Sequence, residues 1–301
     1  DAVTSSLRGL VESMATLENF MGFRDGTGAV ATVRASASAS SSVTIKVSDA
    51  RMMWDKLALQ IYDSTLTTLK GTFTVATTAR ARDASGYFQV TGNLSADIVS
   101  GDLLIWPNSL NRVPTGLSKL IDDATGTFQN VSITSYPRYT SPVLDNGAAG
   151  NRALTPTLFR QAMATAKQET GNKKDNTWTS ICTNWQAIEV EQLYESELRI
   201  TPDTKVGGVA IAGFNSSFGR INVTTESHAP FNTMFFVDFS QIYRAVQKEL
   251  DFRRHGGSIF RPNGNAASWI ADATEICEYF IKRRNTSVKI EELSESPQTA
   301  Y

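Results

Sequence analysis

Apolar residues near the start of the chain recur with the period of an α-helix. Spacings of four and three residues alternate along Val3, Leu7, Leu10, Met14, Leu17 and Met21. At about 3.6 residues per turn these positions share one face, so the pattern predicts a helix of about six turns. We expect the glycines of Asp25-Gly26-Thr27-Gly28 to end it. About three heptads are short for a free coiled coil, so the helix is expected to pack on a sheet of the same chain.

Between residues 35 and 112 the apolar positions change to a period of two. A run of alanine and serine at 35–42 comes first, and several of the alternating segments after it are separated by turn residues. Strands are predicted at 43–47, 57–61, 73–75, 87–90 and 103–106. The region is therefore predicted to form a small antiparallel barrel or sandwich inserted between helical parts.

The rest of the chain mixes both periods. Thr155-Pro156 is typical of a helix start, because Thr caps the first turn and Pro fits the first helical position. A second helix is predicted over 185–198, and strands over 209–214, 220–224 and 233–237. Residues 273–282 suit a helix or a strand, but the alternation of Cys277, Tyr279 and Ile281 favours a strand. The fold class predicted from these elements is α+β.

Composition limits the function more than the fold. The chain has 301 residues, 41% of them hydrophobic, enough for two modest domains or one elongated unit with an insertion. A net charge of −1 argues against a general nucleic-acid binder but would allow a shell lining that releases DNA. Its two cysteines show no metal-ligand spacing, and no segment is long and apolar enough to span a bilayer. The first residue is Asp1 rather than Met, so we expect a processed or partial chain.

No segment predicts a reaction centre. His228 and His255 are the only histidines, and a lone histidine is more often a surface or turn residue than a base. The Asp25–Gly28 segment lacks the Lys-Ser/Thr of a phosphate loop and follows a helix instead of a strand. The acidic pair Asp122-Asp123 is typical of a solvated face. We therefore expect no catalytic residue, no cofactor and no metal.

Two short basic groups are the remaining candidates for contact with a partner. They are Arg253-Arg254-His255 and Lys282-Arg283-Arg284, and neither has the interleaved aromatic residues of a single-strand groove. Ion pairing to a neighbouring subunit is therefore favoured at least as much as phosphate contact. We predict that Arg253, Arg254, Arg283 and Arg284 pair with acidic residues of neighbours. Charge reversal at Arg283 and Arg284 is expected to lower assembly while leaving monomer folding nearly intact.

Several segments resemble the major capsid proteins of tailed bacteriophages of the Hong Kong 97 type. The helix end at Leu17–Phe20, with the glycines after it, is similar to the end of that family's spine helix. The most similar stretch, Ala229–Asp238, begins with Ala229-Pro230-Phe231-Asn232. The other similar segments are Gly116–Thr127 with Tyr136-Pro137-Arg138, Leu154-Thr155-Pro156, Leu250-Asp251, and Arg283-Arg284-Asn285 before Val288.

The resemblance implies a peripheral domain with a long spine helix and a sheet, an axial domain, and an inserted β module. The implied parts are the spine helix at 1–34, the β module at 35–115, the peripheral domain continued at 116–175, the axial domain at 176–264, and a return strand and tail at 265–301. Family members normally carry an extended arm and a long loop before or near the spine helix, which nothing upstream of Val3 supplies. We expect a missing upstream part, although the β module could take over some of that reach.

The implied function is a major capsid protein that self-assembles as pentamers and hexamers into an icosahedral shell around double-stranded DNA. Implied partners are copies of itself, portal, scaffold or decoration proteins, and non-specifically packaged DNA on the inner face, with no membrane. The implied location is the virion, after assembly in the host cytoplasm. Two alternatives stay open: an encapsulin-like cellular shell, and a decoration or glycan-binding protein that uses Trp106 or Tyr87 of the β module. An enzyme ranks third.

Overall fold

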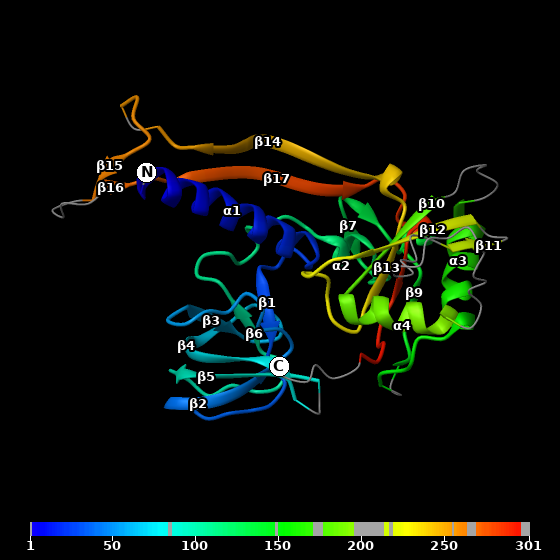
Figure 1. The fold of residues 1–301 in the computed structure, drawn as a ribbon, viewed down its shortest axis with the longest axis horizontal. Coiled ribbons are helices and arrows are strands. Elements are labelled where there is room, and N and C mark those ends of the chain that lie inside the picture. Colours follow the sequence, from blue (N-terminus) through cyan, green and yellow to red (C-terminus); the bar gives the residue numbers. More distant parts are fainter. Residues whose placement is uncertain are drawn as a thin grey trace, which may run out of the picture.

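The computed structural model describes residues 2–83, 86–147, 150–170, 177–195, 214–216, 219–254, 256–263 and 269–295. Helices and strands form three packed groups, which we call the β module, the mixed sheet and the arm (Figure 1). The arm runs along one side of the molecule, above the β module and the mixed sheet in that view. The predicted α+β class is confirmed at this level.

The β module is a six-stranded antiparallel sheet in the order β1-β6-β3-β4-β5-β2. Its strands are β1 (Ala29–Thr32), β2 (Ser40–Val47), β3 (Ala58–Tyr62), β4 (Leu69–Arg82), β5 (Phe88–Leu94) and β6 (Leu103–Ile105). An antiparallel bridge between Val33 and Val47 joins the two end strands. Along β5 the buried side chains of Phe88, Val90 and Leu94 point to one core, as the period-two pattern requires.

The mixed sheet has both parallel and antiparallel pairs, in the order β11-β12-β10-β13-β18-β9. Its strands are β9 (Val143–Leu144), β10 (Thr177–Cys182), β11 (Phe214–Ser216), β12 (Gly219–Thr225), β13 (Met234–Val237) and β18 (Val288–Ile290). Strand β13 is buried on both faces: Met234 and Phe236 enter one core, and Phe235 and Val237 enter another. This explains why its sequence is a continuous apolar run.

Two helices cover the face of the mixed sheet that carries Phe236. They are α3 (Pro156–Thr170) and α4 (Asn184–Glu195), and residues of both lie in the same apolar core. The amide of Leu158 donates to Oγ1 of Thr155 over 3.2 Å, so the predicted cap of α3 is confirmed. The opposite face is covered by the short helix α2 (Leu117–Leu120) and by Phe23, just beyond the end of α1 (Ala2–Gly22).

The arm consists of α1 and a long hairpin of β14 (Ile242–Phe252) and β17 (Ala273–Ile281), which lie side by side (Figure 1). Glu18 on α1 accepts from Tyr279 Oη and pairs with Arg244, each over 2.8 Å, and so holds the helix to the hairpin. Two short strands, β15 (Arg261–Pro262) and β16 (Trp269–Ile270), lie at the far end of the hairpin. We call this end the tip.

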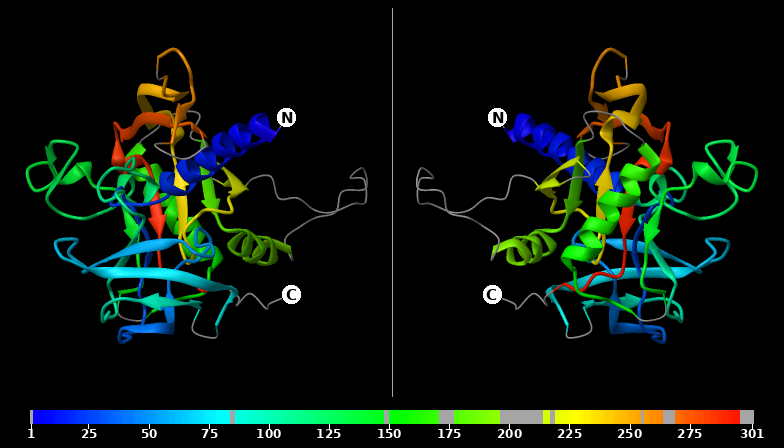
Figure 2. Two further views of the ribbon diagram at one scale, coloured as in Figure 1. Left: turned by 90° about the vertical axis from the view of Figure 1, so that its left-hand side faces the viewer. Right: turned by 90° about the vertical axis from the view of Figure 1, so that its right-hand side faces the viewer.

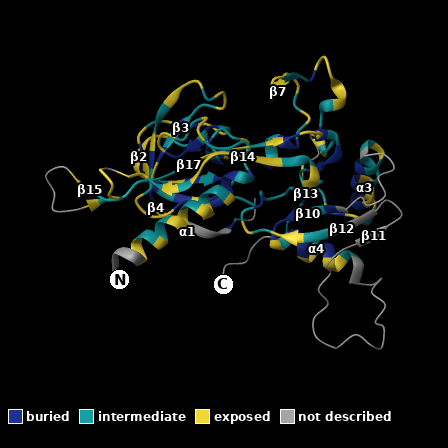
Figure 3. Ribbon diagram, turned by 90° about the horizontal axis from the view of Figure 1, so that it is seen from above, coloured by how far each residue is buried: buried dark blue, intermediate teal, exposed yellow. Residues whose placement is uncertain are grey.

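The arm is much less buried than the other two groups (Figure 3). Strand β14 is exposed at most positions, and Val11 on α1 is 37% exposed although Phe20 and Met21 are buried. A two-stranded hairpin has two unpaired edges and is marginally stable alone. The arm therefore presents surface that a neighbouring molecule could cover.

One further segment projects from the molecule (Figure 2). It carries β7 (Thr127–Phe128) and β8 (Val131–Ser132), which pair with each other. Beyond β8, Tyr136 is 65% exposed.

Two sets of contacts cross the predicted domain boundaries. Helix α3, assigned to the peripheral domain, shares a core with β10 and β13 of the predicted axial domain. Strands β14 and β17 pair across the predicted boundary between residues 264 and 265. The boundaries follow from the resemblance and stay a prediction, whereas these contacts join elements far apart in the sequence. The predicted strand at 209–213 and the predicted helix end at 196–198 lie outside the described residues.

The glycine segment after α1 has a more specific role than helix termination. The helix already ends at Gly22, whereas Gly26 and Gly28 both have φ of +86°. A Cβ on Gly28 would lie 2.5 Å from the carbonyl oxygen of Ser109, closer than real contacts allow. The segment is thus a tight turn that leads the chain from the arm into the β module.

Candidate functional site

The segment Ala229–Asn232 joins the β module to the mixed sheet. Phe231 lies between two guanidinium groups of the β module, with Arg51 centred 4.1 Å and Arg82 centred 4.6 Å from its ring. Its ring also packs on Phe88 at a centroid distance of 5.5 Å. Partly desolvated cation–π contacts of this kind are each worth about 1–2 kcal/mol.

Arg51 is held in this position by a buried carboxylate. Asp49 is 2% exposed, and Arg51 donates to it from Nε over 3.0 Å and from Nη2 over 2.7 Å. Arg24, which follows α1, donates to the same carboxylate. Arg51 also donates to the carbonyl oxygens of Ser227 and Ala229, the latter over 2.9 Å. One acidic side chain therefore orients two arginines, and one of these reaches the mixed sheet.

Arg82 forms the second half of this connection. Its Nη1 lies 2.9 Å from Oε2 of Glu295, and both side chains are almost fully buried, at 5% and 0% exposure. The other oxygen of Glu295 accepts from Thr183 Oγ1 and from the amide of Asn232, each over 2.9 Å. Glu295 thus connects the residue after β10, the segment before β13 and the β module. We call Asp49, Arg51, Arg82, Phe231 and Glu295 the joint.

The joint makes the stability of the protein depend on acid pH. Burial alone would raise the pKa of Asp49, but the charge of Arg24 and the hydrogen bonds from Arg51 outweigh it and hold the pKa below its ordinary value of 3.8. The stability that this depressed pKa contributes is fully present above the pKa of Asp49 in the unfolded state. It is lost as the pH falls through the lower pKa of the folded state. We expect the temperature of the thermal unfolding midpoint to decrease as the pH is lowered below about 4.

Replacing Asp49 with Asn tests this pH dependence. The variant should be less stable at pH 7, because Arg24 and Arg51 lose their counter-charge, and its stability should change less between pH 5 and pH 2. Calorimetry across that range measures both. An acid slope equal to that of the wild type would contradict the assignment.

His228 lies beside the joint and has no catalytic arrangement. Its ring packs edge-on against Phe20 at a centroid distance of 6.1 Å, and its Nδ1 lies 3.5 Å from Glu226 and 3.2 Å from the amide of Asn19. Burial and the charge of Arg51 lower its pKa, which favours the neutral imidazole. It therefore acts as a packing residue here. His255 lies outside the described residues.

Among the described residues, one group of side chains has the spacing of a metal site. Ligand atoms of Glu18, Glu275 and Cys277 lie within 4.8 Å of one another. Arg244, however, pairs with both carboxylates, so a cation is already present between them. The group is best explained as the brace between α1 and the hairpin.

The four arginines predicted to contact neighbours occupy different environments. Arg253 and Arg254 are exposed near the tip of the arm. Arg283 is also exposed, and its guanidinium lies 3.4 Å from the carbonyl oxygen of Glu169. These three are available to a partner, and their role stays a prediction.

The prediction for Arg284 needs correction. Its side chain is 1% exposed and donates to the carbonyl oxygens of Lys119, Leu120 and Asp122 over 2.7–3.0 Å. Its guanidinium also lies 4.1 Å from the ring centre of Phe128. A guanidinium enclosed in this way cannot reach the carboxylate of a neighbour, so Arg284 is an internal brace.

Trp106, considered above as a glycan contact, is 9% exposed and packs between Phe20 and Trp54. It belongs to the core of the β module. Tyr87 is half-buried, with the guanidinium of Arg34 5.7 Å from its ring centre.

Most of the joint was not predictable from the sequence. Ala229-Pro230-Phe231-Asn232 was singled out, but its partners Asp49, Arg51, Arg82 and Glu295 carried no local pattern. They lie about 60 to 180 positions away in the chain, and only tertiary folding brings them together.

A family model matches most of this chain. The model of the SU10 major capsid protein family matches residues 57–256, about two thirds of the chain. No curated protein matches. In the described residues, no helix has the length and apolarity needed to cross a membrane.

Three solved structures have some similarity to this chain. The capsid of cyanophage A-1(L) gives a TM-score of 0.45 at 14% identity, covering 62% of each chain. The capsid of an empty GTA particle gives 0.40 at 10% identity, covering 60% of this chain and 57% of that chain. A virus-like particle from Pyrococcus furiosus gives 0.26 at 12% identity, covering 48% of this chain and 56% of that chain.

The chain spans about three fifths of the length of the first two of these proteins. The family match itself covers β3 to β6 of the β module, the strands of the mixed sheet except β18, and strand β14. The resemblance stated from the sequence is confirmed at the level of the family. This chain belongs to the SU10 major capsid protein family.

Proposed function

We propose that this protein is the major capsid protein of a tailed bacteriophage and builds the icosahedral shell around double-stranded DNA. The family match over residues 57–256 is the observation that carries the proposal. Copies would associate as pentamers and hexamers of the Hong Kong 97 type, with α1 as the spine helix and the β module as an insertion.

The mechanism is geometric. Rings form when one surface of each copy contacts a different surface of the next, and closure at five or six subunits gives the capsomers. The exposed arm supports this mechanism, because strand β14 is exposed at most positions and carries exposed apolar side chains such as Val246, with Ile276 exposed on β17. Arg253, Arg254 and Arg283 would pair with acidic residues of neighbouring subunits. Charge pairs at the edge of an interface determine the register and association rate of the subunits more than their affinity.

The contents of the particle distinguish a virion from a cellular shell. We expect the natural protein to sediment as large particles that protect double-stranded DNA from nuclease. Nuclease treatment followed by extraction and sizing of the nucleic acid is the measurement. Particles that contain a cargo protein and no protected DNA would contradict the genome-enclosing role and favour a cellular compartment.

Portal, scaffold and decoration proteins are the further partners expected of such a shell. Assembly in the host cytoplasm and location in the virion follow from the same proposal. A net charge of −1 suits an inner surface that holds packaged DNA only non-specifically.

A further inference from the structure

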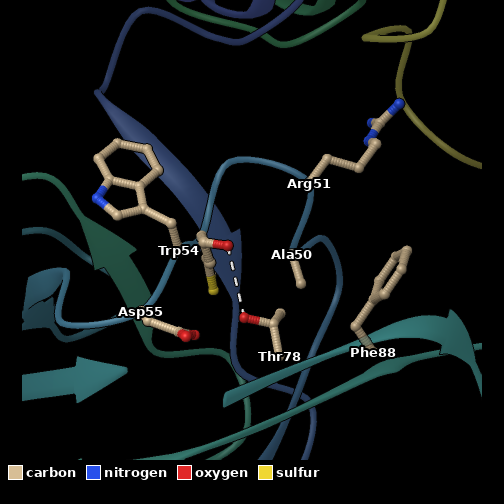
Figure 4. Close-up of a pocket in the computed structure, with 7 residues that line it drawn as sticks. Ala50, Arg51, Trp54, Asp55, Thr78 and Phe88 are labelled. Carbon is tan, nitrogen blue, oxygen red and sulfur yellow. Dashed lines mark hydrogen bonds between the residues drawn. The ribbon is translucent and has the colours of Figure 1, made fainter. Parts of the chain in front are cut away.

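The β module contains a pocket of about 720 Å³ between the loop after β2 and strands β4 and β5. Trp54 and Phe88 stand on opposite sides of it, with Ala50 and Thr78 between them (Figure 4). Arg51 points away toward the joint, where it is already bound. Asp55 lies beside Trp54 at the margin of the pocket. The volume lies in the range of about 300–1,000 Å³ that ligand sites occupy.

Two features show that this pocket can receive a partner. The indole of Trp54 is 55% exposed and rests on Trp106 at a centroid distance of 6.5 Å, so it is a fixed aromatic surface. The carboxylate of Asp55 is exposed and has no hydrogen bond or ion pair with any described residue. The pocket thus offers an aromatic wall and an unpaired negative charge.

The tip of the arm has the complementary features. Trp269 is 70% exposed, the highest value among the large apolar side chains of the described residues. Arg253 and Arg254 are exposed and their guanidinium groups bind no other described residue, whereas Arg261 pairs with Asp272 over 3.0 Å. The amide of Arg253 donates to the carbonyl oxygen of Asp272 over 2.7 Å, which places it close to the strand that carries Trp269.

We propose that the tip of one copy docks into this pocket on a second copy, with Trp269 packing against the exposed indole of Trp54. This inference rests on the proposed self-assembly and names one of its contacts. Arg253 or Arg254 then pairs with Asp55 and lies over the face of Trp54, where the aromatic ring attracts a cation. The two most exposed tryptophans of the chain are covered in a single contact, and buried Trp and Arg side chains dominate interface energetics.

The arrangement of the two surfaces fits a head-to-tail contact. The tip lies at the far end of the hairpin, separate from the β module (Figure 1). A contact between different surfaces of identical subunits is heterologous, and such contacts generate rings when the rotation closes.

A charge swap tests the pairing directly. Asp55→Arg alone, and Arg253→Glu with Arg254→Glu, should each raise the protein concentration needed for assembly by about tenfold, through repulsion at the contact. Combining all three substitutions restores opposite charges and should recover most of the assembly. Light scattering at increasing protein concentration measures the concentration at which assembly begins. The pairing is overturned if the triple variant needs as high a protein concentration for assembly as the worse of the Asp55→Arg variant and the Arg253→Glu, Arg254→Glu variant.

The aromatic part of the contact is tested by Trp269→Ala, which should raise the same concentration by roughly thirtyfold. Leu69→Ala and Val99→Ala are matched controls, because these side chains of the β module are 50% and 51% exposed and lie outside the pocket. Circular dichroism should show wild-type folding for all variants, since every substituted residue is exposed.

The outcomes separate this inference from the proposed function. Assembly of the wild type and the controls with loss in the Trp269 and charge variants supports the contact. Equal assembly of all variants overturns it and leaves the pocket free for another occupant, such as a sugar, while the shell function stands. Failure of the wild type to assemble overturns the proposed function itself.

Discussion

Replacing Arg284 with methionine will lower the free energy of unfolding by about 3–5 kcal/mol, a large share of the stability of an ordinary domain. The guanidinium donates to the carbonyl oxygens of Lys119, Leu120 and Asp122 inside the protein. Methionine fills part of the volume but leaves the carbonyl oxygens of Lys119 and Leu120 without this donor, while that of Asp122 keeps the amide of Ser141. Each orphaned buried group costs about 1–3 kcal/mol. Urea unfolding at neutral pH measures the difference.

The neighbouring residue is the matched control. Arg283 is exposed, so Arg283→Met should change stability by about 0.5 kcal/mol or less. Charge reversal amplifies the contrast: Arg284→Glu should prevent folding, whereas Arg283→Glu should fold normally. The sequence predicted that charge reversal at both Arg283 and Arg284 leaves monomer folding nearly intact. We now expect this only for Arg283. Similar stability losses at both positions would show that Arg284 is not the internal brace described here.

Replacing Glu295 with Gln will destabilise the protein by about 3 kcal/mol. Glutamine can still accept from Thr183 and from the amide of Asn232 through one oxygen. The loss therefore comes from Arg82, whose nearly buried charge no longer has a counter-charge. Chemical denaturation, monitored through tryptophan fluorescence, measures the change.

A double variant separates the charge pair from simple damage to packing. Arg82→Met combined with Glu295→Gln removes both charges, so it should be more stable than Glu295→Gln alone. Lys46→Met breaks the more exposed pair with Asp83 and should cost no more than about 1 kcal/mol. If Glu295→Gln costs as little as Lys46→Met, the joint does not hold the β module to the mixed sheet.

Local elements of this fold were predictable because each depends on neighbours in sequence. The stripe from Val3 to Met21 predicts α1, and the alternation of Cys277, Tyr279 and Ile281 predicts β17; both are confirmed. Thr155 caps α3 as its position before Pro156 indicates. In each case interactions within a short stretch of residues determine the local conformation.

The packing of these elements was not predictable in the same way. Nothing in the local pattern indicates that β14 pairs with β17, or that Glu295 reaches Arg82 across 213 positions. Arg284 shows the same limit, because a basic residue beside Arg283 resembles a surface cluster until the carbonyl groups around it are known. Charged residues that become buried are identified by their partners, and these lie far away in the sequence.

The joint has a consequence for assembly. It fixes the β module to the mixed sheet through buried charges and a ring held between two arginines. If the tip of one copy contacts the β module of the next, the angle held by the joint helps to set the angle between subunits. Variants that weaken the joint should therefore give less uniform particles.

Electron microscopy of the purified protein in its natural sequence context tests the central claim most directly. Self-association into a shell predicts closed particles of uniform diameter, tens of nanometres across, built from rings of five and six subunits. Monodisperse single subunits at high protein concentration, with no rings or shells on the grid, would contradict it.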